Sequence, residues 1–169
     1  QKINLNPSEE EIENELNINK INGNIEFKKV NFCYKKDSFA LKNIDLEISK
    51  GEIVAFVGAS GAGKSTMMSL ILKFQKQSSG DIYLDGKNIK MINSKCIRKN
   101  IAIVQQQPFL FSGTVKEAIR MGRKFTDDDI IQSAKIANAD EFINKLPEKY
   151  DTHITERNCN FSGGQIQRL

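Results

Sequence analysis

The chain has 169 residues, a net charge of +4 and a hydrophobic fraction of 39%, values typical of a globular protein. Its basic residues are interleaved with acidic ones, and no Lys/Arg cluster contains aromatic residues, so a nucleic-acid partner is disfavoured. No apolar run approaches the roughly 20 residues needed to cross a bilayer. The three cysteines are widely spaced, which favours a reducing compartment over a disulfide framework or a zinc site.

The first half of the chain reads as a linker followed by strands. Residues 1–24 are polar, acidic and Asn-rich, so we expect a linker or mobile arm. Apolar residues then alternate over 25–34, and their parity changes at Lys28–Lys29, which predicts two strand segments joined at a bulge. Another strand is expected over 41–48. The apolar run 53–57 that follows is typical of a buried parallel strand.

Residues 58–65, Gly-Ala-Ser-Gly-Ala-Gly-Lys-Ser, fit the phosphate-binding loop G-x-x-x-x-G-K-[ST] at every fixed position. Residues 66–74 have apolar side chains at helical spacing, so a strand, a glycine loop and a helix follow one another in the order that this motif requires. A chance Gly-rich turn before an ordinary helix is the alternative, and the flanking strand and helix make it the weaker one.

The residue types in this loop suit a polyphosphate. Its glycines let backbone amides approach an anion, and the N-terminus of the helix adds roughly half a positive charge. Lys64 would place a full charge against the β- and γ-phosphates, and the Ser65 hydroxyl would bind Mg²⁺. We therefore predict that the chain binds a nucleoside triphosphate.

The second half begins with strands and becomes helical. An Asp-Gly pair within 80–89 predicts a hairpin, and 101–104 is a second candidate for a buried strand. Helices are expected over 115–121, closed by Gly122, from Thr126 through Ala137, and over 139–146. Near the end, Ser162-Gly163-Gly164 precedes another helix. Alone, this triplet would be a helix N-cap, but its hydroxyl and free amides could also bind an anion.

The two motifs together give a family resemblance. Residues 24–169 resemble the nucleotide-binding domain of ATP-binding cassette (ABC) transporters, in particular the exporter branch that includes multidrug-resistance and peptide transporters. Residues 58–65 match its Walker A loop, Ser162-Gly163-Gly164-Gln165 its signature, Gln106 its Q-loop glutamine and Tyr34 its adenine-stacking aromatic. Residues 155–157 occupy the position of the exporter-specific loop. Phe161, Asn158 and Ile166 depart from the usual leucine, glycine and lysine of the signature region.

The resemblance implies an α/β P-loop fold: an ABC-type core sheet, an antiparallel β-subdomain (about 25–50 plus the 81–89 hairpin) and a helical subdomain (about 112–165). It implies ATP and Mg²⁺ as cofactors, with Lys64 and Gln106 as catalytic residues and Ser65 and Gln106 as metal ligands. It implies that these residues bind the nucleotide: Tyr34, Gly58, Ser60, Gly61, Ala62, Gly63, Lys64, Ser65, Thr66, Ser162, Gly163, Gly164 and Gln165.

The family also implies partners and a location. Two such domains associate head-to-tail, so that ATP on Lys64 of one meets Ser162 and Gly164 of the other. Each is attached to a transmembrane domain, here through the 1–24 linker, and works on the cytosolic face of a membrane, coupling ATP binding and hydrolysis to export. A soluble ABC-type ATPase and a non-catalytic nucleotide sensor are the alternatives. The interval between Lys64 and Ser162 leaves no room for the long coiled coil of DNA-maintenance relatives.

The resemblance breaks off at Leu169, inside the signature helix, so we expect an incomplete domain. The family's Walker B aspartate, catalytic glutamate and switch histidine would lie outside these residues, and hydrolysis by the isolated chain is not expected. Some assignments have plainer alternatives: Tyr34 shares the parity of Val30 and Phe32 and could be a core residue, and Gln106 could be a solvated loop amide. The pair Glu156–Arg157 could be merely solvated. The only histidine, His153, precedes the signature and is expected at the surface.

Overall fold

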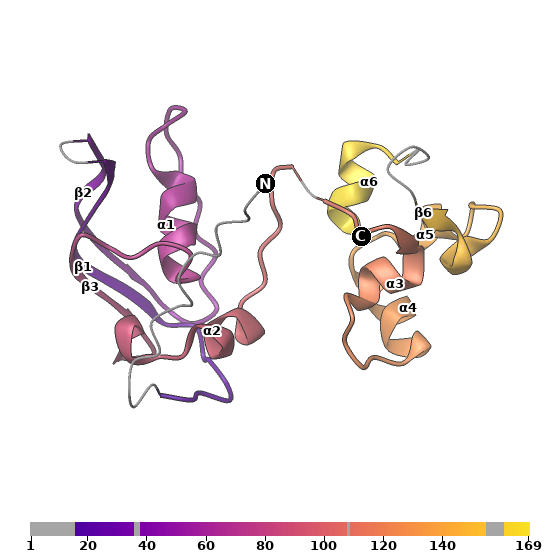
Figure 1. The fold of residues 1–169 in the computed structure, drawn as a ribbon, viewed down its shortest axis with the longest axis horizontal. Helices are drawn as coiled ribbons and strands as arrows, with labels where there is room; N and C mark the ends of the chain where they lie inside the picture. The colour runs from indigo at the N-terminus through magenta and orange to yellow at the C-terminus, as the bar shows by residue number, and fades with distance from the viewer. Residues whose placement is uncertain (1–15, 36–37, 108, 155–160) are drawn as a thin grey trace, which may run out of the picture. The chain divides into compact units, whose positions relative to one another are not determined.

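The computed structural model describes residues 16–35, 38–107, 109–154 and 161–169. The chain forms two compact units, Gln1–Ala102 (unit 1) and Ile103–Leu169 (unit 2) (Figure 1). Each unit has its own hydrophobic core. No helix within the described ranges is both long enough and apolar enough to cross a bilayer. The expected residues 1–15 of the linker lie outside the described part.

Unit 1 is built on a four-stranded antiparallel sheet in the order β2-β1-β3-β4. Its strands are β1 (Ile25–Lys35), β2 (Ser38–Ile48), β3 (Ser79–Leu84) and β4 (Lys87–Asn88). The predicted bulge is confirmed, because the β1–β2 register shifts between Phe27 and Val30. The predicted hairpin is confirmed too: Asp85 and Gly86 both have positive φ, as a tight Asp-Gly turn between β3 and β4 requires.

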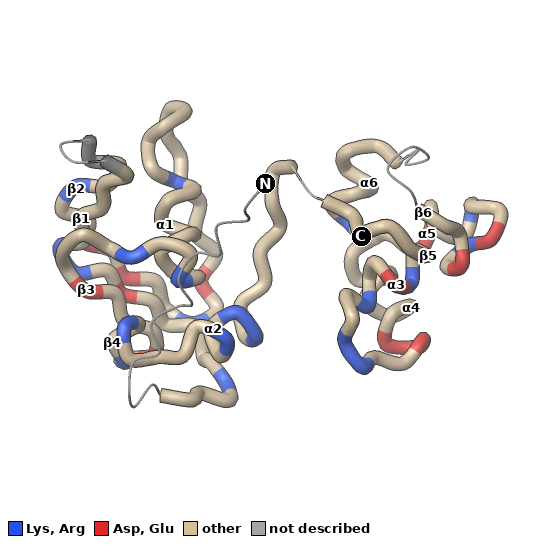
Figure 2. Tube along the Cα trace, viewed as in Figure 1, with Lys and Arg blue, Asp and Glu red and all other residues tan. Residues whose placement is uncertain are grey.

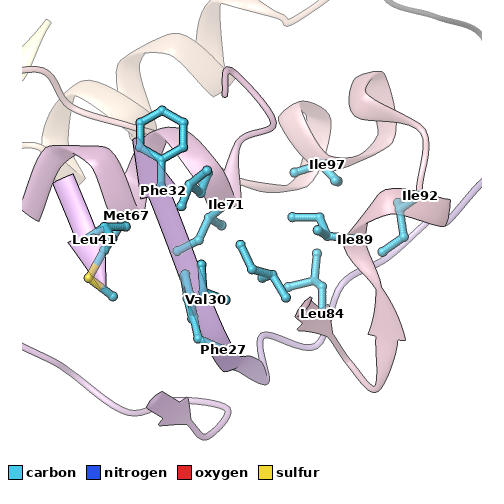
Figure 3. Close-up of a cluster of buried hydrophobic side chains, with 12 residues drawn as sticks. Phe27, Val30, Phe32, Leu41, Met67, Ile71, Leu84, Ile89, Ile92 and Ile97 are labelled. Carbon is cyan, nitrogen blue, oxygen red and sulfur yellow. The ribbon is translucent and has the colours of Figure 1, made fainter. Parts of the chain in front are cut away.

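The core of unit 1 lies between this sheet and its helices. Alternation on β1 buries Phe27, Val30 and Phe32, which pack with Met67, Leu70 and Ile71 of α1 (Lys64–Ile71) (Figure 3). Buried isoleucines of η1 (Ile89–Met91) and α2 (Ser94–Asn100) complete the cluster. Arg98 of α2 donates hydrogen bonds to the carbonyls of Leu72 and Lys73, which ties α2 to the end of α1.

The described part of the expected linker is bound to unit 1. Leu16 forms an isolated parallel bridge with Ile92. Farther along, the Asp85 carboxylate accepts hydrogen bonds from the backbone N–H groups of Asn22, Gly23 and Asn24 at 2.6, 3.0 and 3.0 Å. Leu16 and residues 22–24 thus contact unit 1, and for 22–24 a carboxylate far away in sequence supplies the acceptors. The linker over residues 1–24 stays a prediction.

Unit 2 is mostly helical. Its elements are β5 (Gly113–Thr114), α3 (Val115–Arg120), α4 (Asp127–Ile136), α5 (Asp140–Ile143), η2 (Lys149–Asp151), β6 (His153–Ile154) and α6 (Gly163–Arg168). The core joins Val115, Ala134, Ala139, Ile143 and Ile154. Thr126 caps α4 as predicted, in a capping box with Asp129. The last predicted helix, 139–146, is helical only over the four residues of α5.

The two predicted parallel strands are not formed. Residues 53–57 and 101–104 belong to no strand, and Ile53 and Val57 are 98% and 94% exposed. Among the described residues every strand pair is antiparallel, apart from the isolated Leu16–Ile92 bridge. A β-prone segment becomes a strand only where a neighbouring strand supplies backbone partners. No described residue supplies them here, so the prediction of buried parallel strands was wrong for this structure.

Gly63 is where α1 meets the sheet. It has φ +84°, and a Cβ there would lie 2.6 Å from the Ala40 carbonyl oxygen and 2.6 Å from Leu41 Cδ2 on β2. Gly61 has a similar φ of +82°, but its Cβ would meet nothing within 4 Å. Of these two glycines, only Gly63 lies so close to β2 that a side chain would not fit. This close approach fixes the start of α1 against β2.

Gly63→Ala should lower the free energy of unfolding by about 3 kcal/mol, because it adds a clash with backbone to the strain of positive φ. Gly61→Ala, the matched control, should cost only about 1 kcal/mol, from the backbone strain. Urea unfolding followed by circular dichroism measures both. Equal losses would show that the contact with β2 does not hold the helix.

Asp85→Asn should destabilise unit 1 by about 1–2 kcal/mol at pH 7, because an amide accepts the three N–H groups less strongly than a carboxylate does. Burial raises the pKa of Asp85, but the backbone hydrogen bonds outweigh it, and the pKa lies below its ordinary value. The carboxylate's contribution is therefore full above the ordinary pKa of about 3.9 and is lost as the pH falls through the lower, folded value. The difference in the free energy of unfolding between wild type and Asp85→Asn should therefore become smaller as the pH falls below about 3.9.

Glu47→Gln is the control for Asp85→Asn, because it makes the same carboxylate-to-amide change on an exposed residue of β2. Glu47 lies opposite Glu26, so removing its charge relieves repulsion between like charges. The free energy of unfolding in urea should therefore stay the same or rise slightly. If the free energies of unfolding of Asp85→Asn and wild type differ by the same amount at every pH, the ionised carboxylate of Asp85 is not what stabilises unit 1.

Candidate nucleotide-binding site

The predicted phosphate loop runs from Gly58 to Gly63 and leads directly into α1. Its backbone turns back on itself, with Ala62 N–H donating to the Ala59 carbonyl at 3.2 Å. Gly61, a central residue of this turn, has the left-handed conformation, and Gly63, which follows the turn at the start of α1, has it too. The loop carries no acidic side chain, and Figure 2 shows it without red at the start of α1. It is therefore free of the charges that would repel an anion.

The N-terminus of α1 has no side-chain cap. Gly63 stands at the N-cap position and offers no side chain, and the first turn contains no acidic residue. Most helices in soluble proteins satisfy their first N–H groups with a capping oxygen. Here these donors and the positive end of the helix dipole are available to an external anion, which is the arrangement that phosphate-binding loops use.

Lys64 and Ser65 begin the helix. The Lys64 ammonium donates hydrogen bonds to the carbonyls of Gly58 and Ala59 at 2.8 and 2.7 Å, so it lies across its own loop. Phosphate oxygens are stronger acceptors for an ammonium than neutral carbonyls are. Ser65 is exposed at the same end of α1. Lysine, hydroxyl and free amides thus converge at one place and suit a triphosphate with a hard divalent cation.

The protein groups near the phosphate loop decide how Mg²⁺ could be bound there. Within the described ranges, no three His, Cys, Asp or Glu side chains gather closely enough to hold a metal ion. Mg²⁺ keeps several waters and commonly binds through substrate phosphates with few protein ligands. The Ser65 hydroxyl fits that role, as one neutral oxygen beside a loop that carries no acidic side chain.

Tyr34 ends up outside the core. Its side chain is 61% exposed, whereas Val30 and Phe32, four and two residues earlier, are buried. Its ring stands edge-on to Phe32, with centroids 4.8 Å apart and planes at 87°. The hydroxyls of Tyr34 and Thr66 lie 3.1 Å apart, in hydrogen-bonding contact. The alternative that Tyr34 is a core residue is therefore wrong, and an aromatic face remains available beside the phosphate loop.

Thr66 differs from the other predicted nucleotide-binding residues. It is 6% exposed, and its hydroxyl contacts Tyr34. The family resemblance assigns Thr66 to the nucleotide and does not predict this contact. No signal in the sequence points to it, because Tyr34 and Thr66 are brought together only by the packing of β1 against α1.

The remaining predicted site residues belong to unit 2. Gln106 is exposed, and its backbone carbonyl accepts a hydrogen bond from Gln167 Nε2 at 3.5 Å. Ser162 caps α6: its Oγ accepts from Gln165 N–H, and Gln165 Oε1 accepts from Ser162 N–H. The plainer reading of Ser162 as a helix cap therefore holds in this structure, whatever further role it has. The space around Gly163 and Gly164 is open.

Two minor expectations can be placed as well. His153 is exposed on β6, as expected. The exporter-specific residues Glu156 and Arg157 lie outside the described residues. The structure thus brings Tyr34, the phosphate loop and Thr66 together in unit 1, and holds Gln106 and the signature residues in unit 2.

Comparison with known proteins is consistent with this geometry. The ABC transporter family pattern matches residues 41–169. The chain is 48% identical over 150 residues to a Mycoplasma pneumoniae protein named as an ABC transporter ATP-binding protein, covering 88% of the chain and 24% of that protein. It is 50% identical over 149 residues to a Staphylococcus aureus protein named as a multidrug export ATP-binding/permease protein, covering 87% and 26%.

A third relative, named multidrug resistance protein 1 of Entamoeba histolytica, is 47% identical over 154 residues, which are 88% of the chain and 12% of that protein. The chain thus spans about a quarter or less of the length of these curated relatives. Because the family pattern covers most of the chain, the chain belongs to the ABC transporter family, as an ATP-binding domain of the multidrug-export type.

Proposed function

We propose that this domain binds MgATP at the phosphate loop of unit 1 and that the full-length protein uses its hydrolysis to drive export across a membrane. The observation that carries the first half is the uncapped N-terminus of α1 behind a glycine loop that holds Lys64. Loop amides and helix amides would hold the β- and γ-phosphates, Ser65 and Gln106 would ligate Mg²⁺, and Tyr34 would stack on adenine.

The contacts of Lys64 suggest how binding proceeds. Its ammonium donates to two loop carbonyls, and a triphosphate would offer it charged acceptors in their place. Lys64 and Mg²⁺ would then neutralise the charge that develops on the phosphates when water attacks in line. Gln106 would help to place that water.

The names of the relatives support a proposal about partners. Names that pair ATP binding with a permease or with multidrug export favour an exporter over a soluble ATPase. We propose a head-to-tail pair of these domains, in which Ser162 and Gly164 of one copy face the phosphates held by the other. A transmembrane domain would connect through the segment before Ile25, with both copies on the cytosolic face.

We further propose that the 169-residue chain alone binds nucleotide without turning it over. The family activates water with an aspartate and a glutamate that follow the signature helix, and the present sequence reaches only that helix. If those residues are degenerate in the full-length protein, a nucleotide sensor becomes the better description. Steady hydrolysis by the full-length protein would reject the sensor.

Lys64→Ala should weaken MgATP binding by the full-length protein about 10- to 100-fold, because a charge-assisted hydrogen bond to phosphate is lost. Lys76→Ala is the matched control. It makes the same change at an exposed lysine beyond the other end of α1 and should bind as wild type does. Isothermal titration calorimetry measures both. Equal affinity of the Lys64→Ala variant and the wild type would refute the proposed site.

Ser162→Ala and Thr126→Ala separate capping from catalysis. Each removes the hydroxyl of a capping box and should cost about 1 kcal/mol of stability. Only Ser162→Ala should also abolish ATP hydrolysis by the full-length protein, because only Ser162 is proposed to contact a partner's phosphates. If Thr126→Ala reduces the rate equally, Ser162 acts through helix stability alone.

A further inference from the structure

The Tyr34 side chain is held at two points that belong to different elements. Its ring packs at right angles to the ring of Phe32 of β1, which is 4% exposed, and its hydroxyl contacts Thr66 in the first turn of α1. Between these contacts the ring stays 61% exposed. A tyrosine side chain has two rotatable torsions that matter for ring placement, and one contact at each end of the ring restricts both.

Thr66 is itself firmly placed. It is 6% exposed and directly follows Ser65 in α1, whose start is fixed against β2 by the close approach of Gly63. Its neighbour Met67 donates its N–H to the Gly63 carbonyl at 3.0 Å, which closes the first helical turn. The Thr66 hydroxyl is therefore a fixed point in the same turn that carries Lys64.

From these contacts we infer that Thr66 is a positioning residue: its hydroxyl fixes the Tyr34 ring relative to the phosphate loop, so that the domain selects a nucleoside triphosphate over a bare polyphosphate. This inference rests on the proposed function. The base and the phosphates of a nucleotide are joined by one ribose, so a stacking face helps only if it stands at the matching place. A ring ordered before binding loses less conformational freedom when the base arrives.

The contact predicts a particular pattern of effects. Removing the hydroxyl of either Tyr34 or Thr66 should weaken the contribution of the adenine base to nucleotide affinity. It should leave the contribution of the phosphates unchanged. Removing both should do no more than removing one, because the two hydroxyls act as a pair. A hydroxyl of Thr66 that instead bound phosphate directly would give the opposite pattern, with polyphosphate affinity falling as well.

The experiment compares the affinities of the full-length protein for MgATP and magnesium tripolyphosphate, measured by calorimetry. Thr66→Val, which keeps the shape but lacks the hydroxyl, and Tyr34→Phe, which keeps the ring, should each weaken MgATP about two- to tenfold. Tripolyphosphate affinity should change less than about twofold in either. The double variant should match the single ones, and Thr66→Ser, which restores a hydroxyl, should bind MgATP as wild type does.

Three results would overturn the inference while leaving the phosphate site intact: additive losses in the double variant, an equal loss for tripolyphosphate, or tighter MgATP binding by Thr66→Val, which would mean that the contact competes with nucleotide. If the proposed function itself is wrong, the results will be different. In that case wild type would bind neither ligand, or Lys64→Ala would leave both affinities unchanged.

Discussion

The absence of a side chain at Gly63 is the constraint on which the rest of the site depends. At that position the backbone that enters α1 passes within van der Waals contact of the Ala40 carbonyl and Leu41 on β2, where no Cβ fits. The close approach places the first turn of a helix at the sheet, and glycine at the N-cap leaves that turn without a capping side chain. The uncapped start of α1 and the Tyr34 side chain of β1 meet where the hydroxyls of Tyr34 and Thr66 are in contact.

Local features of this fold could be predicted from the sequence, because neighbouring residues determine them. The phosphate loop, the Asp-Gly hairpin, the bulge at Lys28–Lys29 and the Thr126 cap each depend on a few residues and on intrinsic backbone preferences. Features that depend on distant partners could not be predicted. The Asp85 carboxylate binds backbone N–H groups about 60 positions earlier in the chain, and nothing in residues 16–24 marks them as bound.

The failed strands follow the same rule. Residues 53–57 and 101–104 have the composition of buried parallel strands, yet a strand exists only with its neighbours, and none of the described residues pairs with them. Tyr34 shows the reverse case. Its parity with Val30 and Phe32 suggested burial, and its family position suggested a role at the surface. The structure exposes the ring because the core under β1 ends at Phe32.

The site residues fall into two groups that differ in how they are supported. Tyr34, the phosphate loop and Thr66 share one unit, and Tyr34 contacts Thr66 in the helical turn that follows the loop. Ser162 and Gln165 form reciprocal side-chain-to-backbone hydrogen bonds in a capping box. A Cβ added at Gly163 or Gly164 beside them would meet no described residue within 4 Å. This division suits a family in which each site is proposed to be completed by a second copy.

A ¹H–¹⁵N NMR titration of the chain with MgATP tests the central claim most directly, since it detects weak binding and reports position by position. The account predicts that the largest shifts fall on the amides of residues 58–66, with a smaller set at Tyr34 and Phe32. If millimolar MgATP leaves these amides unmoved, or if the largest shifts lie elsewhere in the chain, the loop held at Gly63 is not the triphosphate site.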